Sequence, residues 1–94
     1  MDDLRAALGQ RVRDLREGLR LSQEQLAERA ELHWTYVSGI ERGRRNPGLN
    51  ILACLAKALR VTLPALVTDL RPHAPKSKVR RGRPPGAQGP KPGR

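Results

Sequence analysis

The stretch Ser22–Asn46, SQEQLAERAELHWTYVSGIERGRRN, decides the fold of this chain. Its apolar residues recur at steps of three and four on both sides of a short break, which is the period of an α-helix. Small and aliphatic residues share one face of each half: Leu26, Ala27 and Ala30 in the first, Val37 and Ile40 in the second. Ala27 is small enough for two steeply crossed helices to touch there. The stretch therefore predicts two short helices joined by a tight turn, the helix-turn-helix arrangement.

Helix boundaries are well signalled around this stretch. Ser22 and Gln25 have the spacing of a capping box, which predicts that one helix begins at Gln23. The next helix is expected over residues 34–42, and Gly43 is expected to end it. A basic loop, residues 44–48, follows.

The flanking sequence predicts further helices on both sides, so the expected fold class is all-α. A helix is expected over residues 3–17, with Asp2 or Asp3 capping its start and Gly18 stopping it. Another is expected over residues 49–59, and residues 61–70 are expected to form a short fifth helix or a turn. The residues expected to face the core are Leu4, Leu8, Val12, Leu15 and then Leu19 along the first apolar stripe, and Ile51, Leu52, Leu55 and Leu59 in the fourth helix.

The charge is divided unevenly along the chain. The formal net charge of the 94 residues is +10. Residues 1–70 carry eleven Lys/Arg and all nine Asp/Glu, a net charge of +2, whereas residues 71–94 carry eight Lys/Arg and no acid. Such asymmetry indicates a polyanionic partner, of which double-stranded DNA is favoured over an anionic membrane because the basic segment has no apolar face.

Residues 71–94 contain six prolines and four glycines, and we expect them to form a disordered tail after a folded domain at residues 1–70. Within the tail, Arg80, Arg81, Gly82 and Arg83, followed by two prolines, resemble an AT-hook, whose arginines enter the narrow minor groove of A·T-rich DNA. The alternative is a basic tail that binds any phosphate backbone through counterion release. The second interpretation is slightly favoured and both stay open.

Several function classes are disfavoured by the residues present. Cys54 is the only cysteine and is expected to be a small core residue, while His33 and His73 are isolated from other metal ligands. No carboxylate pair or nucleophile with a base is evident, so we expect neither an enzyme nor a metal or other cofactor. No apolar stretch approaches the roughly twenty residues of a membrane span, and the start of the chain lacks a signal-peptide core. The expected location is the cytoplasm, in association with the nucleoid.

The second helix of the central motif presents short polar side chains outward. When residues 34–42 are projected at about 100° per residue with Val37 and Ile40 inward, the outward positions are Thr35, Ser38, Gly39 and Arg42. Trp34 and Tyr36 lie on the flanks. Hydroxyls of this kind can meet base edges in a major groove. The residues positioned to hold phosphates are Gln23, Arg42, Arg44, Arg45 and Asn46.

Residues 10–67 resemble the phage-repressor (Cro/cI, or XRE) family of helix-turn-helix domains, through the segments LSQEQLAERA, YVSGIERGRRNPGL and ILACLAKALRV. The resemblance implies five helices, with a recognition helix at residues 34–42, and a homodimer on a two-fold symmetric operator. It also implies a buried ion pair between Arg16 and Glu41. The implied base-reading residues are Trp34, Thr35, Ser38 and Gly39, and the implied phosphate contacts are Gln23, Arg42, Arg44 and Arg45.

This chain departs from the family pattern at three positions. Glu31 stands at the turn position that is usually glycine, where a left-handed backbone would cost on the order of 1 to 2 kcal/mol. His33 stands where a better helix cap is usual. Gly39 has no side chain to read a base.

The expected function is a sequence-specific regulator of transcription, either a repressor or a controller. Two alternatives are a nucleoid-type architectural protein with little sequence selectivity and a protein-interaction module with the same fold. The operator sequence and any small-molecule effector stay unassigned.

Overall fold

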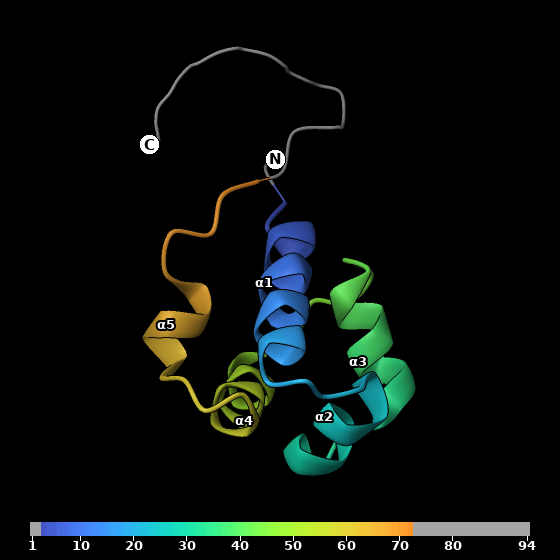
Figure 1. Ribbon diagram of the computed structural model, residues 1–94. Coiled ribbons are helices and arrows are strands. Elements are labelled where there is room, and N and C mark those ends of the chain that lie inside the picture. The colour runs from blue at the N-terminus through green and yellow to red at the C-terminus, as the bar shows by residue number, and fades with distance from the viewer. Residues whose placement is uncertain (1–2, 73–94) are drawn as a thin grey trace.

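The computed structural model describes residues 3–72, and within that range it contains five α-helices and no strand. The helices are α1 (Arg5–Gly18), α2 (Gln23–Ala30), α3 (Trp34–Glu41), α4 (Leu49–Ala58) and α5 (Leu63–Val67). Helix α1 runs through the middle, with α2 and α3 on one side and α4 and α5 on the other (Figure 1). The all-α, five-helix fold expected from the sequence is confirmed. The AT-hook-like segment lies outside the described residues.

Local hydrogen bonds explain where the helices begin. The hydroxyl of Ser22 accepts from the backbone N–H of Gln25 at 3.0 Å, and the side chain of Gln25 accepts from the N–H of Ser22 at 2.8 Å. This reciprocal pair confirms the capping box at the start of α2. Thr62 caps α5 by accepting from the N–H of Ala65 at 3.1 Å, and Asp3 accepts from the N–H of Arg5 at 2.9 Å.

Helix ends rely less on glycine than the sequence predicts. Gly18 does not stop α1 but is its last residue, and the left-handed conformation falls instead on Arg20, with φ of 60°. Glu31, Arg60 and Asp69 are also left-handed, with φ of 59°, 63° and 58°. Only after α3 does a glycine, Gly43, take this role, with φ of 75°. Each non-glycine corner costs about 1 to 2 kcal/mol, which packing elsewhere must offset.

The core is continuous through all five helices. Every helix contributes at least one side chain with 0% exposure: Val12 from α1, Leu26 from α2, Val37 and Ile40 from α3, Leu55 from α4 and Leu66 from α5. Burial of a side chain of this size stabilises by about 1.5 to 3 kcal/mol relative to leaving it exposed. The inward faces expected for residues 22–46 are therefore the ones that form the core. No helix among residues 3–72 has the length and apolar character needed to cross a membrane.

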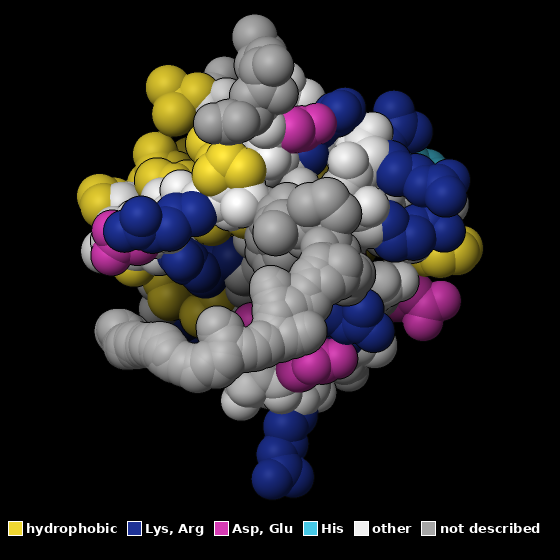
Figure 2. Space-filling model, turned by 90° about the horizontal axis from the view of Figure 1, so that it is seen from above, with side chains coloured by type: hydrophobic (Ala, Val, Ile, Leu, Met, Phe, Trp, Pro, Cys, Tyr) yellow, Lys and Arg dark blue, Asp and Glu magenta, His cyan; other side chains and the backbone are white. Residues whose placement is uncertain are grey.

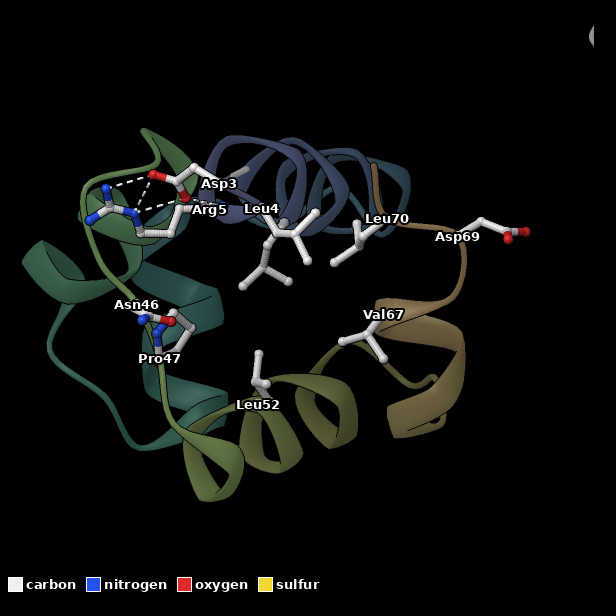
Figure 3. A pocket seen from close by; sticks show the side chains of 10 residues that line it. Asp3, Leu4, Arg5, Asn46, Pro47, Leu52, Val67, Asp69 and Leu70 are labelled. Atoms are coloured by element: carbon white, nitrogen blue, oxygen red, sulfur yellow. Dashed lines mark hydrogen bonds and ion pairs between the residues drawn. The ribbon is translucent and has the colours of Figure 1, made fainter. Parts of the chain in front are cut away.

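Three residues predicted to be in the core are exposed, and one of them, Leu19, follows the last residue of α1 and is 36% exposed. Cys54 lies on the outer side of α4, because the apolar residues of α4 extend beyond the one face that packs inward. Leu4 is 45% exposed because α1 and α4 do not close over it. A hollow of about 670 Å³ lies between α1 and α4, and Leu4, Leu52, Val67 and Leu70 line it (Figure 3).

Close approach between α1 and α3 depends on the absence of a side chain at Gly9. A Cβ atom at Gly9 would lie 2.3 Å from the carbonyl oxygen of Ile40 and 2.7 Å from that of Glu41. Both obstacles are backbone atoms, so neither can move aside without shifting α3. Gly9 therefore sets the spacing of the two helices.

We predict that Gly9→Ala destabilises the fold by about 1 to 3 kcal/mol, because overpacking forces the backbones of α1 and α3 apart. Gly18→Ala is the matched control in the same helix, since nothing lies within 4 Å of a Cβ placed there. Urea unfolding monitored by circular dichroism measures both. Equal stability of the two variants would contradict the role assigned to Gly9.

Candidate nucleic-acid interface

The two sides of α3 differ sharply in exposure. Val37 and Ile40 are fully buried, whereas Trp34 is 49% exposed and Thr35 is also exposed. Ser38 is half-buried. Because these polar and aromatic groups face solvent from a helix whose other side is held in the core, they form a surface whose position is fixed.

Gly39 does not lie on the exposed surface as the helical projection predicts. It is buried, and the side chain that covers it belongs to Arg45. A Cβ atom at Gly39 would lie 2.9 Å from Cγ of Arg45 and 3.3 Å from its Nε. The loop is also tied to this position through its backbone, since the N–H of Arg44 donates to the carbonyl of Gly39 at 2.8 Å.

The basic loop after α3 supplies a cluster of cations beside the exposed surface. Arg42, Arg44, Arg45 and Asn46 are all exposed. The guanidinium carbon of Arg45 lies 5.5 Å from the centre of the Tyr36 ring, within the range of a cation–π contact. Lys and Arg side chains gather on the side of the molecule where α3 lies, and hydrophobic side chains gather on the α5 side (Figure 2). The exposed arginines of this loop therefore lie next to α3.

The structure brings Arg16 of α1 and Glu41 of α3 into a bidentate ion pair. Nε of Arg16 donates to Oε2 of Glu41 at 2.6 Å, and Nη2 donates to Oε1 at 3.1 Å. The side chains are 11% and 2% exposed. Hydrogen bonding to Glu41 raises the pKa of Arg16 and outweighs the opposite effect of burial. A third bond, from Nη1 to the carbonyl of Leu21 at 2.7 Å, attaches the start of α2 to the same group.

Gln23 takes part in this network, which sequence reasoning did not anticipate. Its Nε2 donates to Oε1 of Glu41 at 3.0 Å, and the side chain is half-buried. The residue predicted to hold a phosphate is thus also bonded to the carboxylate at the end of α3. The two residues are 18 positions apart, so no local sequence signal indicates their contact.

The turn between α2 and α3 is left-handed at Glu31, the position where the resemblance implies a glycine. The N–H of Glu31 donates to the carbonyl of Glu28, and the N–H of Leu32 donates to the carbonyl of Ala27. These two hydrogen bonds end α2. His33 precedes α3 without a side-chain cap. Over the part of the chain that the structure describes, no three His, Cys, Asp or Glu side chains gather as they would around a metal ion.

A family model, two sequence relatives and a solved structure that resemble this chain agree on the class of protein. A family model described as a helix-turn-helix domain matches residues 7–70. A control protein, C.SmaI of Serratia marcescens, is 47% identical over 66 residues, which are 70% of this chain and 79% of that protein. An immunity repressor protein of Bacillus phage phi105 is 43% identical over 62 residues, which are 66% of this chain but 43% of the repressor. The crystal structure of the restriction-modification controller protein C.AhdI from Aeromonas hydrophila is similar, with a TM-score of 0.64 and 44% identity over 65% of this chain and 92% of that one.

We predict that Arg16→Ala lowers the free energy of unfolding by about 3 kcal/mol, because it leaves the Glu41 carboxylate buried without its cation. Arg13→Ala is the control, since Arg13 and Glu17 form an exposed pair at 3.4 Å on the same helix. That variant should change stability by less than about 0.5 kcal/mol. Thermal and urea unfolding measure both, and an unchanged midpoint for Arg16→Ala would contradict a structural role for the pair.

Proposed function

The chain belongs to the helix-turn-helix domain family, and from this membership we propose that it regulates transcription by binding a specific double-stranded DNA sequence. The resemblance to phage repressors noted in the sequence is confirmed by the relatives. Those relatives are described as controllers and a repressor, which supports a regulatory role. The observation that carries the proposal is the exposed side of α3, fixed to the core and bordered by the arginine loop.

We propose that α3 lies in the major groove with its N-terminal half against the base edges. The hydroxyls of Thr35 and Ser38 would donate to or accept from bases, and the ring carbons of Trp34 would meet a thymine methyl group. The exposure of Trp34 and Thr35 supports this proposal. Gly39 is not retained as a direct reader because it is buried and has no side chain.

The phosphate contacts would come from both sides of α3. Arg42, Arg44 and Asn46 are exposed at its end, where they can hold the backbone of one strand. Gln23 and the free N–H groups in the first turn of α2 would hold a phosphate on the other side. These contacts position α3 without carrying sequence information.

We further propose that two copies of the chain bind a two-fold symmetric operator, with one α3 in each half-site. In such dimers the half-sites lie about 34 Å apart, one turn of B-DNA, or a multiple of it. The pair would act by blocking RNA polymerase or by recruiting it. Residues 71–94 would add charge-driven contacts to the phosphates or the minor groove.

A mobility-shift assay tests the function directly, with the DNA upstream of the gene compared with a scrambled sequence of the same composition. We expect clear preference for the upstream DNA. A chain that ends at residue 72 should bind more weakly and with a smaller salt dependence but should keep this preference, because the tail contributes phosphate contacts. Equal affinity for both sequences, or loss of nearly all binding on truncation, would instead indicate an architectural protein.

Substitutions separate readers of bases from holders of phosphate. We expect Thr35→Ala and Ser38→Ala to change the preference among operator variants. Arg44→Ala should weaken binding to all sequences alike and reduce the salt slope by about 1. Titrations against a panel of single-base operator variants at two salt concentrations measure these effects. A uniform loss in all three variants would show that the reading surface of α3 is misassigned.

A further inference from the structure

We propose that Arg45 is a specificity-determining residue that reads a guanine in the major groove, and that Gly39 provides the slot on α3 through which it does so. The proposal rests on the DNA-binding function proposed above. It changes the roles assigned to both residues, because the sequence predicts a phosphate contact for Arg45 and a base contact for Gly39.

The first support is the packing of the Arg45 side chain against the helix. Its Cγ, Nε and Cδ would lie 2.9, 3.3 and 3.6 Å from a Cβ atom at Gly39, so any other residue would occupy the same space. All three of these near atoms belong to Arg45. The missing side chain of Gly39 therefore leaves room for the aliphatic stem of Arg45 to lie across α3.

The second support is the direction in which that side chain runs. Its guanidinium carbon lies 5.5 Å from the ring centre of Tyr36, which precedes Gly39 by one helical turn. The charge is thus carried from the loop back toward the N-terminal part of α3, the part that contacts base edges in this kind of docking. A residue that only held phosphate would have no need to cross the reading helix.

The third support is chemical. A guanidinium presents a planar fork of donors that matches O6 and N7 of guanine, the commonest specific contact in the major groove. Within residues 3–72, Arg45 has no ion pair with a carboxylate. The contact with the Tyr36 ring holds the guanidinium beside α3. Arg44 is the natural comparison, since it is adjacent, equally charged and exposed.

The test uses the full chain and three variants, Arg45→Ala, Arg44→Ala and Gly39→Ala, each used to select operators from a random DNA pool. We expect the parent chain to select a guanine at one position of each half-site. Arg45→Ala should lose this preference by about 10-fold, the scale of one bidentate base contact. Arg44→Ala should keep the preference and bind all sequences more weakly. Replacement of that guanine by 7-deazaguanine, which lacks N7, should weaken the parent chain and leave Arg45→Ala unaffected.

Gly39→Ala separates the position of Arg45 from its charge. The added methyl group displaces the arginine stem, so the guanine preference should fall while affinity for unrelated DNA is unchanged. The melting temperature should change little, because alanine favours the helix more than glycine does and the clash is with side-chain atoms of Arg45 and not with backbone.

The outcomes distinguish the inference from the function beneath it. A parent chain with no selective binding would overturn both. Selective binding in which Arg45→Ala weakens every sequence alike, as a phosphate contact would, overturns the inference alone. So does a guanine preference that survives in Gly39→Ala.

Discussion

The bidentate ion pair between Arg16 and Glu41 is the interaction on which the placement of α3 and its exposed side depends. It joins α1 to the end of α3, and through Leu21 and Gln23 it also holds the start of α2. A buried pair of this kind adds little net stability compared with apolar residues of the same size, because both charges lose their hydration. Its value lies in geometry, since a planar guanidinium accepts few alternative arrangements. The orientation of α3 relative to the core is therefore specified by directional bonds as well as by packing.

Most of the fold could be predicted because its signals are local. The capping box at Ser22 and the helical period of Val37 and Ile40 involve residues only a turn apart. The incorrect predictions of core residues have a common cause. Neighbours distant in the sequence decide which face of α4 packs inward and whether any residue covers Leu4. The sequence pattern therefore predicts Cys54 and Leu4 in the core, although both are exposed. The sequence predicts that α1 ends at Gly18, because glycine tolerates a left-handed backbone. In the structure Arg20 adopts the left-handed conformation instead.

The candidate site was predictable to the same extent. The outward direction of Thr35 follows from helical geometry alone. The position of Arg45 does not, because a loop side chain can point in many directions and nothing in the sequence says that it lies over Gly39. The role of Gly39 becomes apparent only when the position of the Arg45 side chain over it is known. The contacts between a helix and the loop that follows it therefore cannot be predicted from the sequence pattern and have to be taken from the structure.

The left-handed corner at Glu31 has a consequence for stiffness. A glycine at such a corner can move among several backbone conformations, whereas a residue with a side chain is confined to a narrow well. Since Glu31 joins α2 to α3, the angle between these two helices has little freedom to vary. The two helices would meet a duplex as one rigid body and lose less conformational entropy on binding than a pair joined by a flexible hinge.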